Sequence, residues 1–171
     1  MIAVNLTREQ IAGWLDAYFQ AANDLQGPVE SVAGLRPYFS DGFQFWMYTP
    51  PPFFTPPLSR EELLMTFVHP GVHEKLTPKY YAIDTESMVA VVQFELCFTH
   101  KASGKTWRPL QASAHYHLEA DDAGAIRIGK ILYWTESHQP GDDFDSLFGL
   151  WNQDKEGALL EFGTKYLKGE S

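Results

Sequence analysis

The second half of the sequence alternates between apolar and polar residues, and this alternation constrains the fold more than any other feature. Four segments are rich in Val, Ile, Phe, Tyr and Thr, as strands are: residues 78–86, 88–100, 106–119 and 126–136. The breaks between them, at 86–87, 102–104 and 121–124, are short and polar. Because such breaks suit hairpins rather than crossover helices, the sequence predicts four strands in an antiparallel meander.

The residues before this region follow a helical period instead. Thr7 and Gln10 have the spacing of a capping box. Apolar residues then recur every three or four positions, which predicts an amphipathic helix over about residues 8–23. A short second helix is predicted to begin at Pro28 and to stop before Pro37, because proline suits the first helical turn and disfavours helix at the preceding residue.

Two short elements and a stiff loop are predicted between these helices and the meander. Residues 43–48 form a short aromatic strand in this interpretation. Five prolines then bracket Phe53 and Phe54, which indicates an extended loop. Ser59 and Glu62 repeat the capping-box spacing and predict the start of a third helix.

The order of these elements is that of an α+β protein, in which helices pack on one face of a curved, mainly antiparallel sheet. Apolar residues recur at helical spacing over 144–151 and more weakly over 156–167, so the tail is predicted to return to helix. A length of 171 residues suits one compact domain. We therefore expect a single domain over residues 1–171.

Charge and cysteine content exclude several classes of partner. Thirteen Lys and Arg against 22 Asp and Glu give a net charge of −9, and no basic run is present, which excludes nucleic acid and anionic membranes as partners. Cys97 is the single cysteine, so we expect no internal disulfide and a reducing, cytoplasmic compartment. No apolar stretch approaches the ~18 residues of a membrane span, and the first ten residues lack the features of a secretion signal.

The order of elements, together with the segment GAIRIGKILYW at 124–134, resembles the NTF2-like superfamily of cone-shaped α+β folds. That superfamily includes ketosteroid isomerases, SnoaL-type polyketide cyclases, limonene-epoxide hydrolases and scytalone dehydratases. The resemblance spans about residues 8–152. It implies a hydrophobic small-molecule ligand and chemistry without a metal.

Two segments resemble scytalone dehydratase in particular. The segment FDSLF at 144–148 resembles the FDxxF segment with which a C-terminal helix of that enzyme closes over its ligand, and LSREELLMTFV at 58–68 resembles its third helix. The helix at 144–151 is therefore expected to be a mobile lid. Compared with ketosteroid isomerases, Tyr18 lies at a position resembling their oxyanion-donating tyrosine, whereas the position of their aspartate base falls near Met47.

The resemblance to scytalone dehydratase also implies positions for catalytic residues. Its two active-site histidines correspond to Tyr80 and His100. The serine and asparagine of its central strand fall on Ser113 and His115, and one of its two water-holding tyrosines is best matched by Tyr48.

The predicted strand over 108–119 has one polar and one apolar face. The polar residues are Gln111, Ser113, His115, His117 and Glu119. Two interpretations are open, in which the polar face meets either solvent or a partner subunit, or lines a cavity. The resemblance favours the cavity, so we expect Ser113 and His115 to face inward. If they lie on the outer face of the sheet instead, Tyr116 becomes the candidate on this strand.

Metal and cofactor sites are not expected. His115 and His117 could hold a metal with Glu119 as a third ligand. However, no other histidine has a matching spacing, and the resemblance implies metal-free chemistry. Neither of the phosphate-binding motifs GxGxxG and GxxxxGK[ST] occurs, so no nucleotide cofactor is indicated.

Histidine is the side chain that titrates near neutral pH, which makes His100 and His115 the first candidates for proton transfer. Tyr18, Tyr48 and Tyr80 are candidates to hydrogen-bond a substrate oxygen or to hold a water. Packing is the alternative interpretation of each tyrosine.

Aromatic residues make up 15% of the chain, more than the packing of a small core requires. We expect them to line a deep apolar cavity with few polar groups, as in small-molecule sites, with core packing as the alternative for each. The expected substrate-binding residues are Trp14, Tyr18, Phe45, Phe53, Phe54, Trp134, Phe144 and Phe148.

Two functions are consistent with these features. The first is a cofactor-independent lyase, cyclase or isomerase that applies dehydratase-like acid–base chemistry to a hydrophobic ring compound such as a polyketide or terpenoid. The second is a non-catalytic module that binds a hydrophobic ligand or forms dimers. In either case a homo-oligomer, a dimer or a trimer, is expected. Histidine and tyrosine side chains that converge in a cavity would favour the enzyme.

Overall fold

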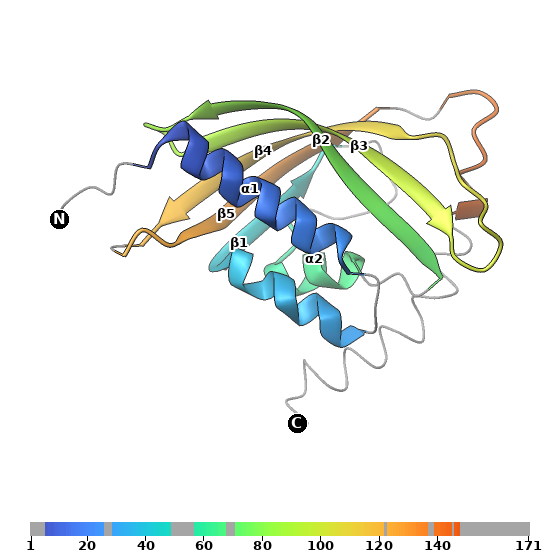
Figure 1. Cartoon of the computed structure of the whole chain (residues 1–171), viewed down its shortest axis with the longest axis horizontal. Helices are drawn as coiled ribbons and strands as arrows, with labels where there is room; N and C mark the ends of the chain where they lie inside the picture. Colours follow the sequence, from blue (N-terminus) through green and yellow to red (C-terminus); the bar gives the residue numbers. More distant parts are fainter. Residues whose placement is uncertain are drawn as a thin grey trace.

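A five-stranded sheet with helices along one side forms the frame of the protein (Figure 1). The computed structural model describes residues 6–25, 29–48, 57–67, 71–121, 123–136, 139–144 and 146–147. The elements are, in chain order, α1 (Arg8–Asn23), the 3-10 helix η1 (Val29–Tyr38), β1 (Phe39–Met47), α2 (Arg60–Thr66), β2 (Val72–Asp84), β3 (Val89–His100), β4 (Leu110–Ala120) and β5 (Ile126–Thr135). None of the described helices is both long and apolar enough to cross a membrane.

Four of the strands form the meander that the sequence predicts. β2, β3, β4 and β5 pair in succession, each antiparallel to the next. β1 pairs with β5 in parallel. The strand order is therefore β1-β5-β4-β3-β2, and the sheet is mixed. These observations confirm the α+β class and the mainly antiparallel sheet.

Several element boundaries differ from the predictions. β1 begins at Phe39 rather than at residue 43, and its register with β5 shifts between Phe39 and Gln44. β2 begins at Val72 rather than at residue 78. The strand alternation already starts at Val72, before the segment rich in β-branched and aromatic residues begins. The second helix continues through Pro37 as a 3-10 helix.

Polar contacts fix α1 along the edge strand β2. The predicted capping box of Thr7 and Gln10 is present at the start of α1. At the other end, the side-chain amide of Asn23 pairs with the backbone of Leu76, accepting from its N–H at 2.7 Å and donating to its carbonyl at 2.8 Å. Between these ends, the Tyr81 hydroxyl donates to the Asp16 carboxylate at 2.5 Å. The position of α1 on the sheet is thus set by side chains as well as by apolar packing.

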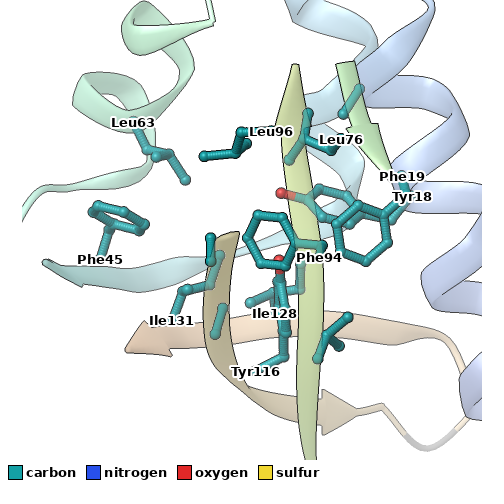
Figure 2. Packing of buried hydrophobic residues seen from close by; sticks show 14 of the residues in the cluster. Tyr18, Phe19, Phe45, Leu63, Leu76, Phe94, Leu96, Tyr116, Ile128 and Ile131 are labelled. Carbon is teal, nitrogen blue, oxygen red and sulfur yellow. The ribbon is translucent and has the colours of Figure 1, made fainter. Parts of the chain in front are cut away.

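One face of the sheet, called the inner face below, packs against α1 and holds the core. On β3 and β4 every second residue is buried, and this set consists of Ala90, Val92, Phe94, Leu96, Phe98, Leu110, Ala112, Ala114, Tyr116 and Leu118. These residues meet the buried stripe of α1, which consists of Ile11, Leu15, Tyr18, Phe19 and Ala22. Figure 2 shows part of this packing. The opposite side of the sheet is called the outer face.

A segment near the C-terminus, the tail segment (139–147), packs onto the loop before β4. The Trp107 indole N–H donates to the Asp143 carbonyl at 2.8 Å. The Arg108 guanidinium donates to both Asp142 carboxylate oxygens at 2.9 and 2.7 Å. Beneath these polar contacts Phe144 is buried. The helices predicted for 156–167 and for the remainder of 144–151 lie outside the described residues.

Candidate functional site

Three tyrosines from three different elements come together on the inner face. Tyr18 belongs to the apolar stripe of α1, and Tyr116 belongs to the buried set of β4. Their rings meet edge-on with centroids 6.0 Å apart. Tyr133 of β5 packs against Phe94 at 6.0 Å and against Phe45 at 5.7 Å. The site is therefore formed by α1 and the three central strands β3, β4 and β5.

Tyr18 and Tyr116 belong to the buried packing of the inner face. Figure 2 shows both tyrosines among the apolar side chains of this packing. Both rings are in edge contact with Phe19 as well as with each other. A phenolic hydroxyl can donate a hydrogen bond to a ligand oxygen.

Burial keeps these phenols protonated. Desolvation is the main cause that raises the pKa of Tyr18, Tyr116 and Tyr133 above that of an exposed tyrosine. The charge of Glu74 raises the pKa of Tyr18 and Tyr133 further. At neutral pH the cluster therefore consists of neutral hydrogen-bond donors.

Glu74 brings a carboxylate to the same face. It faces Phe98 across the β2–β3 ladder, and Phe98 is a buried inner-face residue. Its neighbours two positions away, Val72 and Leu76, are buried on the same side of β2. Glu74 is thus half-buried on the inner face, with its charge acting on Tyr18 and Tyr133.

Apolar side chains surround the tyrosines. The labelled ones in Figure 2 are Phe19, Phe45, Leu63, Leu76, Phe94, Leu96, Ile128 and Ile131. Aliphatic and aromatic side chains around a few convergent polar groups are typical of sites for small hydrophobic molecules.

His100 lies at the end of the inner face. It pairs with the buried Val72 across the β2–β3 ladder, which places both residues on the same side of the sheet. Its Nδ1 atom lies 2.7 Å from the Ser103 hydroxyl, which fixes the orientation of the ring. The structure therefore keeps His100 on the face of the tyrosines, at the margin of the apolar core.

Ser113 and His115 lie on the outer face, and the prediction that they face inward is wrong. Both are partly exposed, whereas their neighbours Ala112, Ala114 and Tyr116 are buried. The alternation defined two faces without deciding which one is covered. Because the helices bury apolar surface, they cover the face of the two alanines and Tyr116.

Tyr48, Tyr80 and Trp134 lie away from the tyrosine cluster as well. The rings of Tyr48 and Trp134 stack with centroids 5.0 Å apart, and His115 contacts Trp134 at 4.8 Å. These three side chains form an aromatic group on the outer face, called the outer cluster below. Tyr80 is 57% exposed and pairs with Gln93, which is also exposed. No described contact connects these residues with Tyr18 or Tyr116.

The expected substrate-binding residues divide in the same way. Tyr18 and Phe45 lie in or next to the tyrosine cluster. Trp14 is on α1 but packs on Tyr38 at 5.4 Å, and Phe144 is buried as part of the tail segment. Three further expected residues lie outside the described residues: Phe53, Phe54 and Phe148.

The candidate metal ligands do not form a site in the described part of the chain, where no group of three His, Cys, Asp or Glu side chains is placed to hold an ion. Burial lowers the pKa of His117, and the charges of Lys130 and His115 lower it further. His117 is therefore neutral near pH 7, with its Nε2 atom buried among the described residues without a hydrogen-bond partner.

Tyr133 and Glu74 are not among the site residues predicted from the sequence. Tyr133 could have been found from the alternation of β5, which places it on the same face as the buried Ile131. Glu74 precedes the β-rich segment, so it was not assigned to a strand. The alternation of Val72, Glu74 and Leu76 was the available signal, and it shows a carboxylate between two apolar inward positions.

Comparison with known proteins identifies the fold. No protein-family model and no curated protein sequence matches the chain. Among solved structures, PrhC from Penicillium brasilianum is similar with a TM-score of 0.60 at 14% identity, covering 91% of each chain. The BvnE pinacolase from Penicillium brevicompactum is similar with a TM-score of 0.58 at 14% identity, covering 92% of this chain and 97% of its own.

A third similar structure is a ketosteroid isomerase-like protein from Erwinia carotovora atroseptica, with a TM-score of 0.52 at 17% identity over 77% of this chain and 100% of its own. These similarities, together with the helices on one face of the mixed sheet, show that the chain has the cone-shaped NTF2-like fold.

Proposed function

We propose that this protein is a cofactor-independent enzyme that catalyses an isomerisation, cyclisation or elimination on a hydrophobic, ring-containing carbonyl compound of polyketide or terpenoid type. The observation that supports this most directly is the cluster of protonated, buried tyrosines on an otherwise apolar face. Solved structures with this fold include a pinacolase and a ketosteroid isomerase-like protein, which is consistent with acid–base chemistry on such compounds.

In the proposed mechanism, Tyr18 and Tyr116 donate hydrogen bonds to the carbonyl oxygen of the substrate. This draws electron density from the carbonyl and acidifies the C–H bond next to it. A general base accepts the proton of that C–H bond, and the electron pair moves to form the enol double bond. His100 is not used in this step, because it lies ten residues along β3 from Ala90, the residue opposite Tyr116. The proton then returns to a different carbon in an isomerisation, or to a leaving hydroxyl group in a dehydration.

The proposed roles differ from those expected from the sequence. His115 and Ser113 take no part, because they lie on the outer face. Tyr48 and Tyr80 are also excluded from the proposed mechanism by their exposure. Tyr18 keeps the role expected for it, and Tyr116 becomes the candidate on β4.

A test of this proposal uses 2-acetylnaphthalene, a neutral aromatic ketone with an exchangeable methyl group next to its carbonyl. In deuterated buffer an enzyme of this type accelerates the replacement of methyl hydrogen by deuterium, which proton NMR follows directly. We expect acceleration by the wild-type protein and its loss in Tyr18→Phe. Tyr80→Phe is the matched control, because Tyr80 is 57% exposed and lies away from the cluster.

A non-catalytic carrier of hydrophobic ligands is the second candidate. It is favoured by the raised pKa of all three phenols, because groups that hold their protons so firmly are poor proton-transfer groups at neutral pH. Binding of 2-acetylnaphthalene without accelerated deuterium exchange would support the carrier and contradict the enzyme.

The outer cluster supports a proposal on assembly. Tyr48 is 51% exposed although its ring stacks on Trp134, so aromatic surface on this face is available to a second copy of the chain. We therefore propose a homo-oligomer, a dimer or a trimer, in the reducing environment of the cytoplasm. Light scattering of the wild-type protein and of Trp134→Glu tests the assembly. An unchanged mass in the variant would contradict an interface on this face.

A further inference from the structure

We infer that the free edge of β2 is a latent surface for strand pairing with β2 of a second copy of the chain, and that the side chain of Asn23 keeps this edge closed. The inference is independent of the proposed function, because it concerns a sheet edge and not the tyrosine cluster. It also differs from the proposed assembly, which uses the outer cluster on the face of the sheet.

The Asn23 amide occupies the place of a neighbouring strand. β2 forms one edge of the described sheet. The side-chain oxygen of Asn23 accepts from the Leu76 N–H at 2.7 Å, and its NH₂ group donates to the Leu76 carbonyl at 2.8 Å. In antiparallel strands, two paired residues exchange both backbone hydrogen bonds in the same way. The amide thus imitates a peptide group of a sixth strand.

The edge next to Leu76 carries three further features that hinder strand pairing. Pro78 lies two positions further along, on the same side of the strand by alternation, and it has no N–H to donate. The register with β3 shifts between Pro78 and Tyr80. The Arg8 guanidinium of α1 donates to the Tyr81 carbonyl at 3.3 Å. Proline, irregular register and covering side chains are the means by which proteins protect edge strands.

Asn23 is the feature that can be withdrawn, because it is the last residue of α1. Asparagine has a lower helix propensity than alanine, and helix ends open more readily than helix centres. When this end opens, Leu76 presents a backbone donor and a backbone acceptor at the edge. An antiparallel register with Leu76 opposite Leu76 of a second copy replaces both lost bonds in each copy. A second copy is therefore the occupant that fits.

The first test measures the cap directly, as the exchange rate of the Leu76 amide proton followed by NMR. In Asn23→Ala we expect this proton to exchange roughly tenfold faster or more than in the wild-type protein, because its acceptor is removed. Asn23→Asp keeps an acceptor oxygen and should keep most of the protection. Gln20→Ala is the matched control on α1, because it removes only the exposed hydrogen bond to Asp24 and should leave the rate unchanged.

The second test measures strand pairing with a fluorescent peptide that has the sequence of residues 72–84. Fluorescence anisotropy should show that Asn23→Ala binds this peptide roughly tenfold more tightly or better than the wild-type protein does. The same peptide with a methyl group on the Leu76 nitrogen lacks the central donor and should not bind. Light scattering should show a mass for Asn23→Ala that exceeds the wild-type mass increasingly as concentration rises.

Thr7→Ala separates edge opening from general weakening of α1. It removes the capping box at the other end of the helix and leaves the contact between Asn23 and Leu76 in place. It should therefore behave as the wild-type protein in peptide binding and in light scattering. If Asn23→Ala does not fold, Asn23→Ser takes its place, because its single hydroxyl is too short to reach both backbone atoms of Leu76.

Three results would overturn the inference. An unchanged Leu76 exchange rate in Asn23→Ala would mean that Asn23 does not cap the edge. Faster exchange without peptide binding and without added mass would mean that the contact only anchors α1. Equal binding of the N-methylated peptide would mean that side chains, and not the backbone edge of β2, form the contact.

Discussion

The ring of Tyr18 on α1 meets the ring of Tyr116 on β4 edge-on, with centroids 6.0 Å apart, and both side chains are 2% exposed. This contact joins the first helix to the centre of the sheet, and Figure 2 shows both tyrosines in the buried packing there. Packing alone would be served equally well by phenylalanine at either position, so the two hydroxyls are the feature that requires a function.

Removing one hydroxyl should affect the reaction far more than the fold. In Tyr18→Phe and in Tyr116→Phe we expect the deuterium exchange of 2-acetylnaphthalene to slow roughly a hundredfold, the typical effect of losing one oxyanion donor. The free energy of unfolding should change by no more than about 1 kcal/mol, because the ring and its contacts remain. Chemical denaturation measures this second quantity. A stability loss much larger than this would identify the hydroxyls as structural.

Alkaline pH should destabilise the protein through the buried phenols. Their pKa in the folded state is raised above the ordinary value of about 10. The stabilisation that results is complete below that ordinary value and is lost as pH rises through the folded pKa, because the unfolded chain releases its protons first. Phenolate absorbance should therefore show fewer than the chain's eight tyrosines titrating before the protein unfolds. All eight titrating with ordinary pKa values in the folded protein would contradict the described burial.

Acid should release the tail segment. The hydrogen bond from Lys105, followed by that from Ser146, lowers the pKa of the Asp143 carboxyl. The contribution of this ion pair is present above the unfolded pKa of about 4 and is lost as pH falls through the lower folded value. Hydrogen exchange read out by mass spectrometry should show residues 139–147 losing protection on acidification.

In Lys105→Met the tail segment should lose part of this protection already at neutral pH. Arg127→Gln, on the exposed side of β5, is the matched control and should leave it unchanged. Equal protection in all three proteins would mean that apolar burial alone holds the segment.

Phe144 tests whether the tail segment acts as a lid. Its side chain is 2% exposed, and truncation of a buried phenylalanine costs about 3–5 kcal/mol when the surroundings stay in place. If the segment closes over the site, Phe144→Ala should weaken the binding of 2-acetylnaphthalene while thermal stability falls by less than this cost implies. A large drop in melting temperature with unchanged affinity would show that Phe144 belongs to the permanent core.

The extent to which the sequence predicts this structure differs between elements. Capping boxes at Thr7 and Ser59 are local signals made by neighbouring residues, and both are present as predicted. The meander follows from alternation and short polar breaks, which are also local. The pairing of β1 with β5 joins two strands that are far apart in the sequence. No local pattern of residues indicates this pairing.

The candidate site shows the same limit. Alternation correctly separated the two faces of β4, but the choice between Tyr116 and the pair Ser113 and His115 required knowledge of where α1 packs. Tyr18 was accessible from the sequence because helical spacing places it on the buried stripe. Glu74 was missed because a charged residue between two apolar residues makes the segment less typical of a strand.

The parallel pairing of β1 with β5 has a consequence for synthesis on the ribosome. β1 contains the buried residues Phe39, Phe43 and Phe45, and its partner strand is the last one of the described sheet to be made. Until β5 emerges, β1 presents an unpaired edge with aromatic side chains, which is a template for association with other nascent chains. A chain interrupted before residue 126 should therefore aggregate rather than persist as a folded fragment, and its fate in the cell depends on how quickly chaperones bind that exposed edge.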